Sequence, residues 1–274
     1  MKQPLIISAV NHKGGCLKTT VTVNLAAALA RAGKKVLVID LDAQQNLTAS
    51  LIGPFSSENG QPTLYDALVD ELSLDDLIMP TGTNGLDIVP VTEEFAGADL
   101  SLVSAVGREG ILRSCLRKTK ALSDYDFVFC DNPPSISLVV MNSLVASDYF
   151  IVPCSAEYLP MVGLSLLANS VAQIKKLAPQ LEALGVVLTL FSRNERICRQ
   201  VETTLRRELA GNIFDTKIRV NTKAKSAPSV QKTIFDYENS PKGRGTEDFT
   251  ALAEEFLRRV EEREQIIYQR AANG

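Results

Sequence analysis

Short apolar runs alternate with longer segments of helical periodicity along most of this chain, and this alternation limits the folds that it can adopt. The run at 127–130, Phe-Val-Phe-Cys, is apolar at every position, which is typical of a strand buried on both faces of a parallel sheet. The helical segments supply the crossover connections that parallel strands need. We therefore predict an α/β fold with a doubly wound, mostly parallel sheet flanked by helices, as a single domain over residues 1–274.

The expected elements can be placed by number. We expect strands at 5–10, 36–40, 86–91, 127–131, 149–153, 186–191 and 213–218. We expect helices at 19–32, 102–118, 162–177, 195–210 and 246–269. Sheets of this kind bind ligands beyond the carboxyl ends of their strands, so the residues that follow the strands form the candidate site.

The composition excludes several classes of protein. A formal net charge of −3 gives no global mark of a nucleic-acid binder. Five dispersed cysteines without C-x-x-C spacing favour a reduced, cytoplasmic protein over one with structural zinc. No apolar stretch reaches the length of a membrane span, no leader-like segment opens the chain, and only ten residues precede the loop described next. We therefore expect neither a membrane anchor nor a separate N-terminal domain.

Residues 11–20, Asn-His-Lys-Gly-Gly-Cys-Leu-Lys-Thr-Thr, connect the first expected strand to the first expected helix. In this context backbone N–H groups and the positive end of the helix face a bound phosphate, and Lys18 adds a full charge. The general pattern G-x-x-x-x-G-K-[ST] expects glycine where this chain has His12 and Leu17. A second lysine, Lys13, would either be exposed to solvent or reach the nucleotide of a facing subunit, as an arginine finger does.

Three acidic residues lie at the ends of two other expected strands. The hydroxyl of Thr19 is the natural direct ligand for Mg²⁺, and Asp131 suits a role in holding the ion through water. Asp40 and Asp42 alternate along extended chain and so would face the same way, one supporting the ion and the other orienting the attacking water. Taken singly, Asp131 would be read as a cap or turn residue and the Asp40–Asp42 pair as an acidic turn.

Four of these segments together resemble the deviant Walker A family of ParA and MinD ATPases. They are Lys-Gly-Gly at 13–15 with Lys-Thr-Thr at 18–20, then 38–44, then Asp-Asn-Pro-Pro-Ser at 131–135. The resemblance runs nearly end to end, and 221–229 and 235–237 are similar to the ParA branch that lacks an N-terminal helix-turn-helix domain. It implies ATP and Mg²⁺ as cofactors and a homodimer in the ATP state.

The resemblance also assigns roles. It implies that Lys13, Lys18 and Asp42 are catalytic, with Lys13 acting across the dimer, and that Thr19, Asp40 and Asp131 support the metal. The nucleotide-binding residues would be Lys13, Gly14, Gly15, Cys16, Leu17, Lys18, Thr19 and Thr20.

A basic cluster adds a second expectation. Residues 193–232 hold ten basic and four acidic side chains, which alone indicates either a solvated face or a DNA-binding one. Lys223 falls where the ParA branch commonly has a DNA-contacting arginine, and we expect Lys225, Lys232 and Arg219 to join it. The resemblance then implies a cytoplasmic, nucleoid-associated ATPase that binds DNA non-specifically and positions a plasmid, chromosome or protein cargo. A ParB-like cargo-bound partner would stimulate its hydrolysis.

The chain departs from the family pattern at three positions, and two other functions stay open. Leu17 replaces a glycine, Ala43 a proline and Ser226 a glutamate, and Leu17 leads us to expect slow hydrolysis. A MinD-like membrane ATPase needs a basic amphipathic C-terminal helix, whereas 254–270 carries five glutamates against four arginines and a core-like stripe at Phe256, Val260 and Ile267. A metabolic synthetase would need a second substrate pocket.

Overall fold

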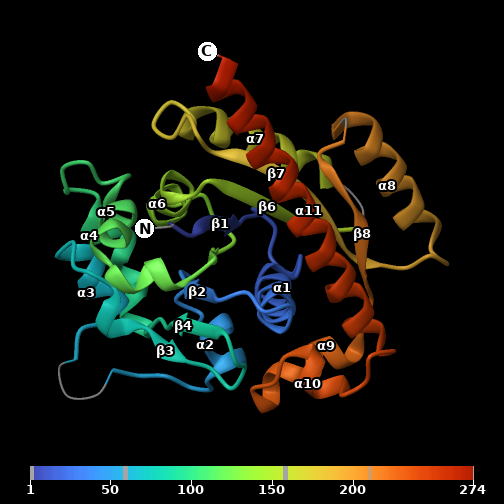
Figure 1. Ribbon diagram of the computed structural model, residues 1–274, viewed down its shortest axis with the longest axis horizontal. Helices are drawn as coiled ribbons and strands as arrows, with labels where there is room; N and C mark the ends of the chain where they lie inside the picture. The colour runs from blue at the N-terminus through green and yellow to red at the C-terminus, as the bar shows by residue number, and fades with distance from the viewer. Residues whose placement is uncertain (1–2, 58–60, 157–159, 210, 274) are drawn as a thin grey trace.

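The computed structural model describes residues 3–57, 61–156, 160–209 and 211–273, with the side chains of 160–164, 267 and 270–273 left out. Its strands form one eight-stranded sheet in the order β3-β4-β2-β5-β1-β6-β7-β8 (Figure 1). All neighbouring strands are parallel except the short pair β3 and β4. The strands are β1 Leu5–Ala9, β2 Val36–Asp40, β3 Met79–Pro80, β4 Leu86–Val89, β5 Phe127–Asp131, β6 Tyr149–Ser155, β7 Glu182–Phe191 and β8 Ile213–Arg219.

Helices cover both faces of the sheet. The α-helices are α1 Lys18–Arg31, α2 Asn46–Leu51, α3 Leu64–Val69, α4 Ala98–Leu102, α5 Ile111–Lys118, α6 Leu138–Ala146, α7 Pro160–Ile174, α8 Arg196–Leu209, α9 Thr222–Ser226, α10 Ile234–Glu238 and α11 Arg244–Asn273. Short 3₁₀ turns are η1 Asp75–Leu77, η2 Glu93–Gly97, η3 Lys120–Asp124 and η4 Ala227–Val230. One face packs on α1 and α11, and the other on α3 to α8. The predicted doubly wound α/β class is confirmed.

The predicted helix at 102–118 is wrong. The chain instead forms α4 and α5, separated by turns over 103–110. Gly107 has a φ of +67°, a left-handed conformation that interrupts helical hydrogen bonding. The predicted strands are confirmed to within a few residues, but β3 and the helices α2, α3, α6, α9 and α10 were not predicted. Helix α6 is apolar almost throughout, so its sequence carries no helical period.

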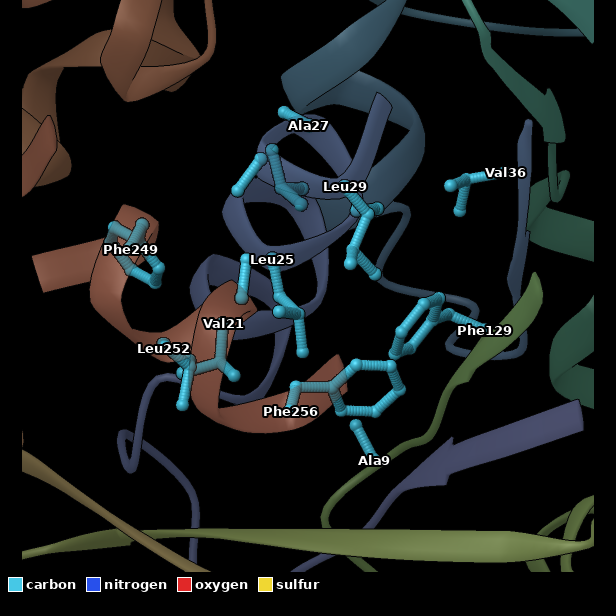
Figure 2. Packing of buried hydrophobic residues seen from close by; sticks show 14 of the residues in the cluster. Ala9, Val21, Leu25, Ala27, Leu29, Val36, Phe129, Phe249, Leu252 and Phe256 are labelled. Carbon is cyan, nitrogen blue, oxygen red and sulfur yellow. The ribbon is translucent and has the colours of Figure 1, made fainter. Parts of the chain in front are cut away.

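The core behind the candidate site is built from α1, α11 and β5. Val21, Leu25 and Leu29 recur every fourth residue on α1 and are buried there (Figure 2). Phe256 of α11 packs edge-on against Phe127 at 5.5 Å between ring centroids. Each such side chain contributes roughly 1.5–3 kcal/mol on burial. This packing fixes where α1 begins relative to the ends of the central strands.

The C-terminal helix α11 uses its apolar stripe for this core. Phe256 and Val260 are buried, which confirms the core-facing reading for these two, while the side chain of Ile267 lies outside the described residues. In the part of the chain that the structure describes, we find no helix with the length and apolar character that crossing a bilayer requires.

Candidate nucleotide site

The site lies where the ends of three neighbouring strands meet. Ala9 of β1 pairs in register with Asp131 of β5, and Asp131 pairs in register with Asp40 of β2. Along the sheet, β5 and then β2 lie to one side of β1, whereas β6, β7 and β8 lie to its other side. The loop after β1 therefore leaves the sheet at the point where the strand order reverses, which is where open α/β sheets bind ligands.

Asn11 anchors the start of the glycine loop. Its side-chain Nδ2 donates to the carbonyl of Pro153 at 2.7 Å, and its Oδ1 accepts from the backbone N–H of Lys13 at 3.0 Å. Farther along, the hydroxyl of Thr189 donates to the carbonyl of Cys16 at 3.0 Å. The loop is thus fixed to β6 and β7 from behind. Sequence reasoning gave Asn11 no role, although an Asn directly after a strand is a common loop-fixing residue.

Lys18 reaches back under this loop. Its side chain is 8% exposed, and within the part of the chain that the structure describes its ammonium donates one hydrogen bond, to the carbonyl of Asn11 at 3.2 Å. An ammonium has three donors, so two stay available for an anion in the loop. A buried cation at a helix N-terminus is the arrangement that a phosphate chain fits.

Leu17 adopts the backbone conformation that a glycine would provide. It stands at the N-cap of α1 with φ 64° and ψ 33°, in the left-handed region. For a residue with a Cβ this conformation costs roughly 1–2 kcal/mol. The loop therefore keeps its turn despite the substitution and stores strain at the residue that precedes Lys18. Gly15, with φ +73°, has open space where a Cβ would stand.

Thr19 and Asp131, two of the three predicted metal residues, lie together. The Thr19 hydroxyl donates to Asp131 Oδ2 at 2.7 Å, and the Thr22 hydroxyl donates to Oδ1 at 3.1 Å. Burial raises the pKa of Asp131 to about 6, opposed by these hydrogen bonds and by Lys18. A hydroxyl and a carboxylate oxygen beside a phosphate loop fit Mg²⁺, which prefers oxygen ligands. Ser137, and not Asp131, caps α6.

Asp40, the third predicted metal residue, is oriented differently. Its carboxylate is fully buried and accepts from the backbone N–H and the hydroxyl of Thr48, at 2.9 and 2.7 Å, and from the N–H of Asp42 at 3.1 Å. Burial, and then the charge of Asp131, raise its pKa to about 7. Asp40 thus fixes α2 and the turn after β2. Asp42 is only half-buried and accepts from the N–H of Gln44 at 3.0 Å, so the two carboxylates do not share one environment.

Three further polar side chains lie in the loop or next to it. Lys13 is exposed, and its Nζ donates to the hydroxyl of Ser155, at the end of β6, at 3.4 Å. His12 Nε2 and Asn132 Oδ1 are buried and have no hydrogen-bond partner among the described residues. Burial and the nearby Lys18 lower the pKa of His12, so its imidazole is neutral near pH 7.

The predicted DNA-binding residues fall into two environments. Lys223 and Lys225 on α9 and Lys232 after η4 are exposed, and none of the three forms an ion pair within the described ranges. Arg219 instead forms ion pairs with Asp248 at 2.6 Å and with Glu247 at 3.1 Å. Its charge is therefore neutralised within the fold, and we do not group it with the three lysines.

The strand order, the loop and the Thr19–Asp131 pair define a P-loop nucleotide-binding protein. A family model described as an AAA domain (AAA_31) matches residues 5–183. The chain is 37% identical to the sporulation initiation inhibitor protein Soj of Bacillus subtilis, covering 91% of this chain and 97% of Soj. It is 35% identical to the chromosome partitioning protein ParA of Myxococcus xanthus, over 93% of this chain and 88% of that one.

The fold of this chain also resembles that of a solved structure. Cobyrinic acid a,c-diamide synthase from Mycobacterium smegmatis, with a bound ATP analogue and magnesium, superposes with a TM-score of 0.80 at 25% identity, over 93% of this chain and 94% of that one. The chain belongs to the ParA/MinD family of P-loop ATPases.

Proposed function

We propose that this protein is an ATP- and Mg²⁺-dependent ATPase that dimerises when ATP is bound, binds DNA without sequence preference, and positions or segregates a cargo. The two lysines of its glycine loop carry this proposal. Lys18 is buried and directed at the loop of its own chain, whereas Lys13 is exposed on the same loop. This division supports one lysine for each side of an ATP-bound dimer, as a trans-acting finger requires.

The residues of the site supply positioning and charge stabilisation. Lys18 and the backbone N–H groups of the loop hold the phosphates, with Thr20 next to them at the start of α1. The Thr19 hydroxyl and Asp131 would hold Mg²⁺, which when bound neutralises charge on the β- and γ-phosphate oxygens. Asp42, less buried than Asp40, orients the attacking water. In our proposal Asp40 holds Asp42 in position, because its carboxylate accepts a hydrogen bond from the backbone N–H of Asp42.

The DNA-binding part rests on Lys223, Lys225 and Lys232. They are exposed without ion pairs in the described parts of the chain, so their charges are available to phosphates. Contacts of this kind are sequence-blind and weaken steeply with salt. ParA of Myxococcus xanthus, a chromosome partitioning protein by name, is a relative that the chain resembles over most of its length. We therefore place the protein on the nucleoid, with a cargo-bound, ParB-like partner that stimulates hydrolysis.

The membrane alternative is disfavoured by the packing of α11. Phe256 and Val260, which an amphipathic anchor would insert into lipid, are buried against the sheet. The superposition with the diamide synthase supports the synthetase alternative. The chain shares only 25% identity with that enzyme, however, and 37% with Soj, so we rank this alternative second. A DNA-binding measurement distinguishes the two functions, because a partitioning ATPase must bind DNA and a synthetase need not.

The proposal is tested by DNA binding measured at several salt concentrations with ATP, with ADP and without nucleotide. We expect binding that requires ATP, ignores sequence and weakens with salt. The double variant Lys223→Gln/Lys225→Gln should lower the affinity for DNA. It should also reduce the slope of the logarithm of the binding constant against the logarithm of the salt concentration by about two. Lys175→Gln/Lys176→Gln, which removes two exposed lysines just after α7, is the matched control. DNA binding that is indifferent to nucleotide, or absent, would exclude this function.

A further inference from the structure

His12, the only histidine of the chain, stands in the glycine loop directly before Lys13. The backbone on both sides of it is held by Asn11. The Oδ1 atom of Asn11 accepts from the N–H of Lys13 at 3.0 Å, and its Nδ2 donates to the carbonyl of Pro153 at 2.7 Å. The imidazole is therefore attached to a part of the loop that has a fixed position relative to the sheet.

The tip of this imidazole is buried, although the residue as a whole is partly exposed. Its Nε2 atom is shielded from solvent and has no hydrogen-bond partner among the residues that the structure describes. An imidazole nitrogen is a donor or an acceptor in every protonation state, and buried polar atoms in native folds nearly always have partners. The unmet hydrogen bond of Nε2 therefore points to a ligand that the loop receives.

Lys18 lies close to the same part of the loop. Its ammonium donates to the carbonyl of Asn11 at 3.2 Å, and this carbonyl belongs to the peptide bond that joins Asn11 to His12. Burial, and then the charge of Lys18, lower the pKa of His12, so the ammonium disfavours a positive imidazole. An anion bound here would accept from both side chains and would reverse this effect of Lys18.

The described side chains around the loop do not supply such an anion. The charged groups nearest to it in the fold are Lys13 of the loop, Lys18 of α1, Asp40 and Asp42 at and after the end of β2, and Asp131 of β5. The three carboxylates are already hydrogen-bonded to groups of α1, of α2 and of the turn after β2. Among the described residues, Lys18 is the only charged side chain that shifts the pKa of His12.

We propose that His12 contacts the nucleotide, with its Nε2–H donating a hydrogen bond to the phosphate chain that Lys18 also holds. This inference rests on the proposed ATP site and adds to it a residue outside the run 13–20. The negative charge of the triphosphate exceeds the single charge of Lys18, so bound ATP raises the pKa of His12 and the imidazole takes up a proton. The hydrogen bond is then charge-assisted. The affinity for ATP is therefore higher at about pH 6 than at about pH 8.

Nuclear magnetic resonance tests this contact without a variant. Protein that carries no histidine tag and is labelled with ¹⁵N-histidine gives a single imidazole, whose nitrogen shifts report its protonation. We expect the pKa of His12 to rise by roughly 1–3 when ATPγS and Mg²⁺ are added. Adenosine, which carries no phosphate, is the control and should leave the titration unchanged. If ATPγS binds and the titration stays the same, the inference is wrong and the proposed function stands. Absence of ATPγS binding would refute both.

Two variants test the contact by isothermal titration. His12→Ala should weaken ATPγS binding about tenfold, as expected for loss of a hydrogen bond to a charged group. His12→Gln keeps an N–H donor and should recover most of this affinity at about pH 8. It takes up no proton, so its affinity should rise less than that of the wild type between about pH 8 and pH 6. Both proteins keep Asp40 and Asp131, so their difference isolates His12. Equal affinities of the wild type and both variants at each pH would overturn the inference.

Discussion

The hydroxyl of Thr19 donates a 2.7 Å hydrogen bond to Asp131 Oδ2, and so joins the first turn of α1 to the end of β5. These residues are 112 positions apart in the chain, and their meeting depends on the packing of α1 against the central strands. A hydroxyl and a carboxylate at this distance can share one magnesium ion or its bound water. The site is therefore assembled by the sheet and not by the loop alone.

Thr19→Ala should abolish magnesium-dependent ATP hydrolysis. Loss of the hydroxyl removes the proposed metal ligand. Metal stabilisation of the transition state is worth several kcal/mol, so we expect at least a 100-fold fall in kcat. Thr19→Ser keeps the hydroxyl and should retain most activity. Phosphate release over a magnesium titration is the measurement. Comparable rates in the alanine and serine variants would show that Thr19 is not a metal ligand.

Leu17→Gly should raise both nucleotide affinity and turnover. Glycine adopts φ 64° without the cost of a Cβ, so the loop reaches its phosphate-binding conformation more easily. Leu17→Ala keeps the Cβ and the strain but removes the bulk of the side chain. If strain is the cause, only the glycine variant will bind ATP more tightly in isothermal titration, by several-fold. Equal gains in both variants would assign the effect to bulk, and unchanged binding and turnover in both would remove Leu17 as a cause of slow hydrolysis.

The contribution of Asp40 to the stability of the nucleotide-free, magnesium-free protein should fall as pH rises from about 4 to 7. The pKa of Asp40 in the folded chain is about 7, well above its ordinary value of 3.8, because the carboxyl is buried beside Asp131. Between these values the unfolded chain has released its proton while the native chain keeps it. At Asp40 the native state thus binds more protons, and the contribution of this residue to the free energy of unfolding falls by up to about 1.4 kcal/mol per pH unit.

Asp40→Asn isolates this contribution. Urea denaturation at a series of pH values should show a smaller decline in the variant, and the difference between the two proteins removes the opposite contributions of carboxyls such as Glu255, whose pKa is lowered. Parallel pH profiles for wild type and variant would mean that Asp40 is ionised in the folded chain throughout this range.

Arg259→Ala should destabilise the fold by about 3–5 kcal/mol, whereas Arg258→Ala should cost less than about 1 kcal/mol. Arg259 is 15% exposed, donates to Glu255 at 2.9 Å, and lies 4.2 Å over the ring of Phe214. Removing it leaves the buried Glu255 with only the longer ion pair to Arg258, at 3.9 Å. Arg258, on the same helix, is 54% exposed, pairs with Glu262 at 2.8 Å and contacts Glu255 only at 3.9 Å. Thermal and chemical denaturation measure the stability of the two variants. Equal losses of stability would mean that the buried Arg259–Glu255 pair contributes no more than an exposed one.

Much of the fold and of the site's location could be predicted from the sequence, because continuous apolar runs mark the buried parallel strands. The rule that ligands bind beyond strand carboxyl ends then brought the loop, Asp42 and Asp131 to one edge. What local pattern could not supply was long-range pairing. Asp40 turns toward Thr48, and the charge of Arg219 is neutralised by Asp248 of α11. The prediction of one continuous helix at 102–118 was wrong for a local reason, because Gly107 adopts a left-handed conformation that interrupts it.

The position of Phe256 has a consequence for the order in which the protein can become functional. The phosphate loop lies near the start of the chain, but α11, which covers Phe127 and Phe129 behind it, follows every other described element. During synthesis these aromatic rings stay uncovered until α11 has emerged. A chain that is still being translated therefore carries all the loop residues without the support that holds α1 in place. We therefore expect the loop to gain this support from α11 only late in translation.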